Sequence, residues 1–165
     1  MKIIAAYPCL GKTTIYKLNK DRCFDCEFNE SRAAMQMNEG LCNRFFNYCA
    51  EIIKLETLAG YYDIIFITDD DRLISKLEKT LRDFKNNVIF VFPDTSDDDV
   101  MKEYKSKVIK RSGIDWYNKV LLPEACNLND RVNYYKECGY DVRLTDLEKR
   151  YIEDVVDFPD DFIFP

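Results

Sequence analysis

Apolar residues follow two patterns along this chain. In the first pattern they form short, almost uninterrupted runs, over residues 3–7, 62–68 and 88–92, and two shorter runs, over 22–26 and 141–144, also contain charged residues. Continuous runs rich in β-branched and aromatic residues are typical of parallel strands that are covered on both faces. These five runs therefore predict strands, and the last of them is short enough to be an edge strand.

In the second pattern, apolar residues recur every three or four positions, as in a helix with one buried side. This spacing predicts helices over about 12–19, 41–59, 71–85, 97–111, 114–122 and 125–138, with Pro123 separating the last two. Thr145 is expected to cap a further helix from Asp146 to about Val155. The tail from Asp157 to Pro165 is expected to be irregular and to dock through three aromatic residues, namely Phe158, Phe162 and Phe164.

Strands that alternate with helices indicate an α/β fold with a parallel sheet of about five strands, right-handed crossovers and helices on both faces. At 165 residues, the chain fits one domain over 1–165. Ligands of such sheets bind beyond the carboxyl ends of the strands. Candidate functional residues are therefore expected at the strand ends.

The first strand is followed by a turn and then by Gly-Lys-Thr-Thr at the start of a helix, which is the layout of a phosphate-binding P-loop. The usual pattern is G-x-x-x-x-G-K-[ST], and Ala6 occupies its first glycine position. The alternative is a tight strand–helix connection with a surface lysine. On the P-loop interpretation, the residues around the phosphates are Pro8, Cys9, Leu10, Gly11, Lys12, Thr13 and Thr14.

A nucleoside triphosphate needs Mg²⁺, which a P-loop hydroxyl and a nearby carboxylate hold. Thr13 supplies the hydroxyl by its motif position, and two acids compete for the carboxylate role, namely Asp25 and Asp69, which follow the second and third strands. The alternative for Asp69 to Asp71 is capping of the next helix. Glu27 either orients an acceptor hydroxyl or is simply solvated.

Basic residues gather at the end of the helix that begins near residue 97, from Lys105 to Arg111. One interpretation is a lid over 95–124 that closes over the phosphates, with Lys107, Lys110 or Arg111 stabilising the charge of the transferred group. The other is that these cations merely complement the negative end of the helix dipole.

Composition narrows the function classes. The net charge of −6 makes a nucleic-acid partner unlikely. The chain has seven cysteines and no histidine, and its one C-x-x-C, formed by Cys23 and Cys26, lacks a second pair. Reduced buried thiols are therefore favoured over a zinc site or disulfides.

No apolar run is long enough to span a bilayer, and no secretory signal is evident, so a cytoplasmic location is expected. No oligomeric state follows from the sequence.

Three segments together resemble a known family. They are Tyr-Pro-Cys-Leu-Gly-Lys-Thr-Thr over 7–14, Asp-Cys-Glu-Phe-Asn-Glu-Ser over 25–31 and Val-Phe-Pro-Asp over 91–94. The chain resembles small P-loop nucleotide-kinase-like proteins, related to adenylate kinase, that bacteriophages, some large viruses and bacteria carry. Those proteins show AFPGxGKS/T, an acidic-plus-serine segment, YPD and a charged helix, in the same order. The likeness covers about residues 2–118.

The resemblance implies a three-layer P-loop NTPase fold that binds ATP and Mg²⁺. It also implies transfer of the γ-phosphoryl group to a small acceptor such as a (deoxy)nucleoside monophosphate, in the host cytoplasm if a phage or virus encodes the protein. By position, Lys12 would bind phosphate, Asp25 the metal or acceptor, and Arg111 would supply lid charge. Two departures stand out: Cys9 replaces a loop glycine, and lysines replace helix arginines.

Two alternatives to this function stay open. The first is a non-catalytic ATP- or GTP-binding protein with a regulatory or assembly role. The second is a kinase that acts on a non-nucleotide acceptor or on a nucleic-acid end.

Overall fold

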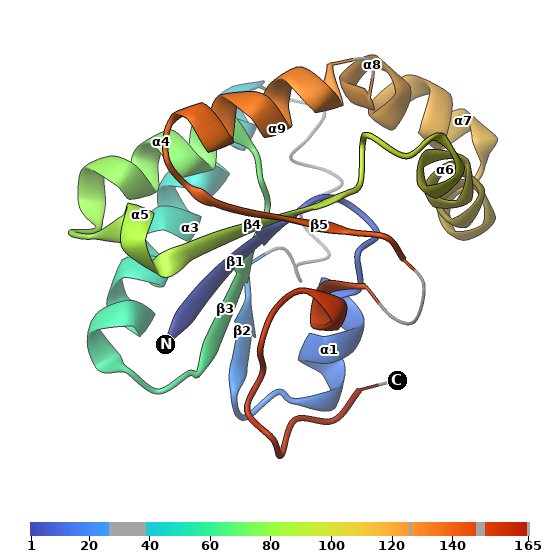
Figure 1. The fold of residues 1–165 in the computed structure, drawn as a ribbon. Coiled ribbons are helices and arrows are strands. Elements are labelled where there is room, and N and C mark those ends of the chain that lie inside the picture. The colour runs from blue at the N-terminus through green and yellow to red at the C-terminus, as the bar shows by residue number, and fades with distance from the viewer. Residues whose placement is uncertain (27–38, 126, 148–150, 165) are drawn as a thin grey trace.

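A computed structural model of the chain describes residues 1–26, 39–125, 127–147 and 151–164 (Figure 1). In this part of the chain, five strands form a sheet in which every pair of neighbours is parallel. The strands are β1 (Lys2–Ala6), β2 (Cys23–Asp25), β3 (Ile64–Ile67), β4 (Val88–Pro93) and β5 (Asp141–Thr145). The predicted α/β fold with a parallel sheet of about five strands is confirmed.

The helices lie between and after these strands. They are α1 (Lys12–Leu18), α3 (Glu39–Ala59), α4 (Asp71–Thr80), α5 (Phe84–Asn87), α6 (Asp98–Ser112), α7 (Ile114–Trp116), the π-helical turn η1 (Tyr117–Leu121), α8 (Leu122–Ala125), α9 (Leu128–Glu137) and the 3₁₀ turn η2 (Ile152–Asp154). None of the helices in the described ranges is long and apolar enough to cross a membrane.

The strand order β2-β3-β1-β4-β5 places β1 at the centre of the sheet. The chain leaves β1 toward β2 on one side, whereas the connection from β3 passes β1 to reach β4 on the other side. Right-handed crossovers that run in opposite directions lie on opposite faces. Accordingly, α1 covers one face of the sheet, and α3, α4, α5 and α9 cover the other (Figure 1).

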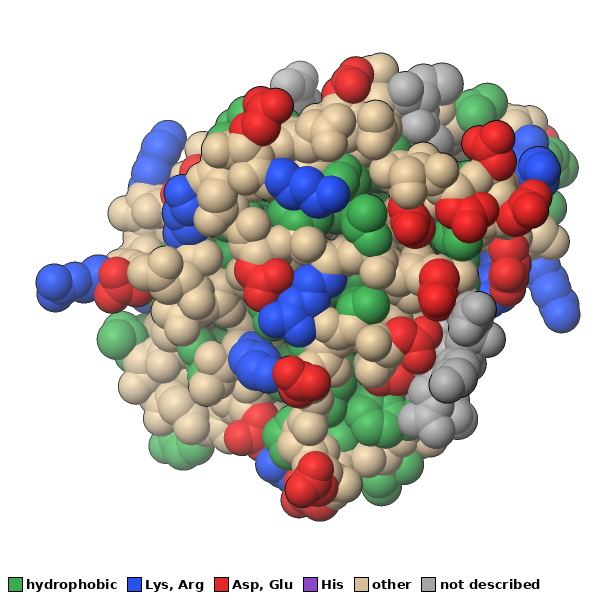
Figure 2. Space-filling model, in the orientation of Figure 1, with side chains coloured by type: hydrophobic (Ala, Val, Ile, Leu, Met, Phe, Trp, Pro, Cys, Tyr) green, Lys and Arg blue, Asp and Glu red, His purple; other side chains and the backbone are tan. Residues whose placement is uncertain are grey.

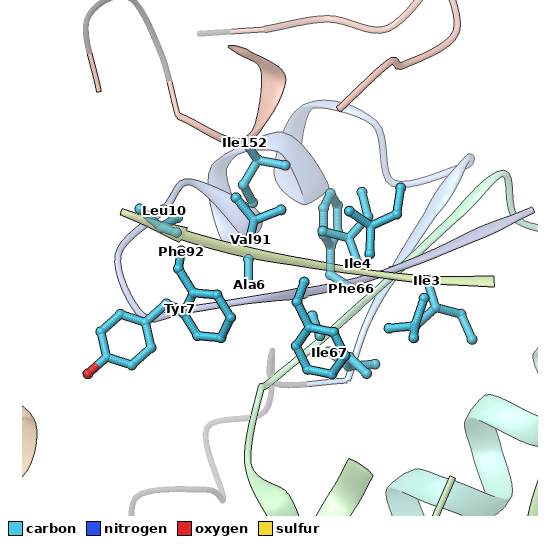
Figure 3. Packing of buried hydrophobic residues seen from close by; sticks show 14 of the residues in the cluster. Ile3, Ile4, Ala6, Tyr7, Leu10, Phe66, Ile67, Val91, Phe92 and Ile152 are labelled. Carbon is cyan, nitrogen blue, oxygen red and sulfur yellow. The ribbon is translucent and has the colours of Figure 1, made fainter. Parts of the chain in front are cut away.

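Side chains of the central strands alternate between these two faces. Ile4 and Val91 lie on the face of α1, where Leu10 and Ile152 also pack, whereas Tyr7 and Phe92 lie on the opposite face (Figure 3). Strands buried on both faces need apolar residues at successive positions. This requirement explains why the sequence of β1, β3 and β4 is continuously apolar.

The C-terminal tail docks on the face of α1, as predicted. Phe162 is buried and packs against Phe158, which also contacts Phe164. The Asn19 side chain donates to the Ile163 carbonyl at 2.8 Å and accepts from the Ile163 N–H at 2.9 Å. The tail is therefore tied directly to the end of α1.

Three local predictions are wrong. The helix expected over 71–85 is broken: α4 ends at Thr80, Leu81 is extended and Asp83 has φ 60°. Leu81 and Phe84 are nevertheless buried. The apolar spacing predicted correctly that these two residues are buried, but a turn, and not a continuous helix, brings them into the core.

The second correction concerns Pro123, which does not separate two helices. It is the second residue of α8, and the helical run continues from Ile114 through η1 to Ala125. A proline inside a helical run removes one backbone hydrogen bond and crowds the preceding turn, and here the run departs from regular α-helical bonding at η1, just before Pro123.

The third correction concerns the helix expected from Asp146 to Val155. Thr145 ends β5, and its hydroxyl accepts from the Leu147 N–H at 3.1 Å. Leu147 has φ 64°, which is incompatible with a right-handed helix. In the described part of this segment, only η2 is helical.

Candidate functional site

The loop between β1 and α1 begins where the sheet ends. The Tyr7 N–H donates to the Val91 carbonyl at 3.0 Å, so the chain stays in register with β4 up to this residue. The N–H groups of Thr14 and Ile15 then donate to the Gly11 carbonyl at 3.0 and 3.1 Å. The loop therefore turns within a few residues into α1.

Two residues of this loop have positive φ. Gly11 has φ 97° and precedes α1, and Cys9 has φ 65°. A left-handed conformation costs a side-chain-bearing residue roughly 1 kcal/mol, whereas glycine adopts it freely. Cys9 thus keeps the backbone conformation that a glycine would favour. Ala6, at the first glycine position of the motif, is fully buried in β1 and has no such conformation.

Lys12 is the first residue of α1, and its side chain is buried, with 6% of the residue exposed. Its ammonium group donates to the Ala6 carbonyl, at the end of β1. The lysine therefore folds back over the loop instead of extending into solvent. The interpretation of Lys12 as an ordinary surface lysine is not compatible with this burial.

The rest of the loop is fixed by packing. Leu10 is buried, and the Tyr104 hydroxyl of α6 donates to the Pro8 carbonyl at 2.7 Å. A Cβ added to Gly11 would lie 3.6–3.9 Å from the Tyr151 ring and Cβ. Thr13 is half-buried and Thr14 is exposed. The loop is thus held between α6 and the segment after β5.

The two carboxylates considered for a metal belong to different faces of the sheet edge. Asp25 is buried. It pairs in register with Phe66 of β3, which in turn pairs with Ile4 of β1. Because residues paired in register point to the same face of a sheet, Asp25 lies on the face of α1, as Ile4 does. Asp69 lies on the opposite face, where it contacts Arg131 of α9, one of the helices that cover that face. Asp25 therefore lies on the same face of the sheet as α1, the helix that begins with Lys12, whereas Asp69 lies on the other face.

Asp69 belongs to a second group of side chains, which we term the Arg131 cluster: Asp69, Asp71, Arg131 and Tyr135. The Arg131 Nε lies 3.5 Å from the Asp69 carboxylate, and Nη2 donates to the Asp69 carbonyl and to the Asp71 carboxylate. The Tyr135 hydroxyl also donates to Asp71, at 2.8 Å. Burial alone would lower the pKa of Arg131, but the two carboxylates raise it above its ordinary value.

Asp70 and Asp94 have structural roles. Asp70 caps α4 by accepting from the Arg72 N–H at 3.0 Å, as the capping interpretation predicted. Burial would raise its pKa, but hydrogen bonds from Arg72 lower it overall. Asp94 accepts from the N–H and hydroxyl of Ser96, and these bonds lower its pKa.

A cavity of about 350 Å³ connects the loop with the Arg131 cluster. Its lining includes Pro8 of the loop, Thr68 after β3, Arg131 of α9, and Trp116 and Val120 of α7 and η1. We term it the edge cavity. It lies beyond the carboxyl ends of the strands, where ligands of such sheets bind.

The basic end of α6 is divided between two environments. Lys107 contacts the segment after β5: its Nζ lies 3.5 Å from the Leu147 carbonyl and 4.9 Å from the centre of the Tyr151 ring. Lys110 and Arg111 lie in the last turn of α6, and Arg111 is exposed without an ion pair among the described residues. Lys107 also pairs with Glu103 of the same helix at 2.6 Å, so its contacts among the described residues are with α6 and the segment after β5.

Of the described cysteines, Cys23, Cys26 and Cys49 are buried, as predicted, whereas Cys9 and Cys138 are partly exposed. Cys9, Cys23, Cys26, Cys49 and Cys138 are all free thiols. Burial raises the pKa of Cys23 to about 12. Within the described ranges, no three Asp, Glu or Cys side chains are grouped as a metal site. Glu27 lies outside the described residues.

The Arg131 cluster was missed at the sequence level. Its members come from the β3–α4 junction and from α9, which are about sixty positions apart in the chain. Only the isolated acids after β3 were visible as a signal.

Comparisons with known proteins found no matching family model and no similar curated protein.

Proposed function

We propose that the β1–α1 loop is a P-loop within a three-layer NTPase fold, and that the protein transfers the γ-phosphoryl group of ATP to a small acceptor. A (deoxy)nucleoside monophosphate is the proposed acceptor. The observation that carries the proposal is the buried ammonium of Lys12, folded back to the end of β1 inside a loop with two positive-φ residues. Such a loop brings backbone N–H groups and a cation to one place, which is the chemistry of phosphate binding.

The topology supports the same location. The chain leaves β1 and β3 in opposite directions, and open parallel sheets bind ligands at such a switch point. The charge distribution supports a small rather than a polymeric ligand. Figure 2 shows acidic side chains gathered on the right of the displayed face, and the chain carries a net charge of −6. A long nucleic acid would be repelled by such a surface.

Mg²⁺ fits the donors on the α1 side of this site. The Thr13 hydroxyl and the Asp25 carboxylate are the hard oxygen ligands that this ion prefers. Asp69, which Arg131 contacts on the opposite face of the sheet, is the other candidate. When bound, the ion would neutralise charge on the β- and γ-phosphates.

The protein's own contribution to transfer would then be positioning and charge. Lys12 would hold the phosphates, and the edge cavity beside Pro8 would receive the acceptor. Arg131 lines that cavity, so it is a stronger candidate than the exposed Arg111 for stabilising the transferred group. Closure of 95–124 as a lid stays a prediction. It is supported by Trp116 of α7 and Val120 of η1, which lie within this segment and line the edge cavity.

The test is a coupled ADP-release assay with ATP, Mg²⁺ and a panel of nucleoside and deoxynucleoside monophosphates. We expect at least one acceptor to stimulate turnover, and Lys12→Ala to reduce kcat/KM by roughly 10³-fold. Lys17→Ala, which removes an exposed lysine of the same helix, serves as the matched control and should leave kcat/KM unchanged.

Calorimetry with ATP separates the alternatives. Binding of ATP without stimulation by any acceptor would reject phosphoryl transfer to nucleotides and favour a nucleotide-binding role. Turnover that survives Lys12→Ala would contradict the P-loop itself.

A further inference from the structure

A second and larger concavity lies between α4 and α9, with a volume of about 880 Å³. We term it the α4–α9 groove. Its lining includes Asp71, Ile74 and Glu78 of α4, Asp130, Arg131 and Tyr134 of α9, and Tyr140, which follows α9. The groove shares Asp71 and Arg131 with the edge cavity but does not include the β1–α1 loop. The phosphotransferase proposal assigns it no role.

The chemistry of the groove favours a cation. Three carboxylates, of Asp71, Glu78 and Asp130, line it against one guanidinium, that of Arg131, which already contacts Asp69 and Asp71. A bound anion would therefore meet net negative charge. An ammonium group, in contrast, would find carboxylate acceptors in the groove.

Tyrosine rings add a second, independent feature. Tyr134, Tyr135 and Tyr140 all line the groove. The Tyr135 and Tyr140 hydroxyls donate to Asp71 and Glu78, which fixes both carboxylates in place. Tyr134 is 60% exposed, so its ring is accessible. Aromatic faces attract cations and also pack against aliphatic chains.

The spacing of the acids defines the kind of cation. Asp71 and Glu78 are seven residues apart on α4, so they lie on one side of the helix, roughly 10 Å apart along its axis. Ile74 lies between them and provides an apolar contact. A linear molecule with ammonium groups at its ends and methylene groups between them matches this order of acid, apolar residue and acid.

We propose that the α4–α9 groove binds a linear aliphatic polyamine. The terminal ammonium groups pair with Asp71 and Glu78, the methylene chain packs on Ile74 and Tyr134, and Asp130 faces the chain from α9. An ammonium group at Asp71 competes with Arg131 for the same carboxylate. A change of turnover on binding would rest on the proposed function, whereas binding itself does not.

The test is isothermal titration calorimetry of spermidine into the full chain, without nucleotide and at physiological ionic strength. We expect saturable binding with one site, and several-fold weaker binding of the shorter diamine putrescine. Glu78→Gln should weaken spermidine binding about tenfold, because it removes one charge-assisted contact. Glu51→Gln removes the same charge from the exposed side of α3 and should change affinity less than twofold.

Asp130→Asn provides a second variant, because Asp130 does not hold Tyr140 and its replacement should not disturb the groove wall. It too should weaken binding, with an unchanged melting temperature. Equal affinities for the Glu78→Gln, Asp130→Asn and Glu51→Gln variants would show general attraction to an acidic protein and overturn the site. Absence of saturable binding by the wild-type chain would overturn it as well. Either failure leaves ATP binding and phosphoryl transfer to be judged separately.

Discussion

The β1–α1 loop and the Arg131 cluster lie at the same edge of the sheet, but they are built in different ways. The loop is contiguous: residues 7–14 form its turn and the start of α1, and Lys12 contacts Ala6, six positions away. The Arg131 cluster joins acids that follow β3 to side chains of α9, 62 positions apart for Arg131 and Asp69. One arrangement depends on local backbone conformation, and the other on how two distant helices pack.

This difference suggests separate roles for the two cations. Lys12 donates to the Ala6 carbonyl, inside the loop that the proposed phosphates would occupy. Arg131 is surrounded by two carboxylates and a phenol. We therefore expect Lys12 to matter mainly for ligand binding, and Arg131 to matter for the stability of the free protein as well.

Replacement of Arg131 should have the largest effect on stability. Arg131→Ala removes the neighbouring cation from the Asp69 carboxylate, whose side chain is only 6% exposed. We expect the free energy of unfolding to fall by about 3 kcal/mol, measured by urea denaturation, because removing one partner of a buried ion pair is strongly destabilising.

The matched control is Lys102→Ala. Lys102 pairs with Asp99 at 2.8 Å, but both side chains are largely exposed, so the loss should be below about 1 kcal/mol. Similar losses for Lys102→Ala and Arg131→Ala would show that the Arg131 cluster is no more than surface charge, and the contrast with the loop would fail.

Replacement of Cys9 should have a smaller effect, of opposite sign. Cys9→Gly relieves the cost of a Cβ at φ 65°, whereas Cys9→Ala removes the thiol but keeps the Cβ. We expect the glycine variant to be more stable than the alanine variant by roughly 1 kcal/mol, measured by urea denaturation. A glycine variant no more stable than the alanine variant would mean that the free loop does not hold the glycine-like conformation.

The same contrast explains how far sequence reasoning could reach. The parallel sheet followed from continuous apolar runs in β1, β3 and β4, because burial on both faces dictates such runs. The loop was predictable because its chemistry is contiguous in the chain. The burial of Lys12, and the left-handed conformation of Cys9, agree with the motif, although the sequence alone could not show either one.

The Arg131 cluster could not be predicted, because no local pattern indicates which face α9 presents to the β3–α4 junction. The acids after β3 had two interpretations, and the structure divides them: Asp70 caps α4, and Asp69 pairs with Arg131. The prediction of a helix over 146–155 was wrong for a related reason. A threonine that suits a helix cap serves a strand end equally well, and tertiary contacts decide between the two.

The most direct test of the central claim is a crystal structure of the protein with a non-hydrolysable ATP analogue and Mg²⁺. The account predicts phosphate oxygens within hydrogen-bond distance of the backbone N–H groups of residues 9–14 and of the Lys12 ammonium, with Thr13 and Asp25 near the ion. An analogue bound elsewhere, or a loop whose N–H groups point away from the phosphates, would contradict it.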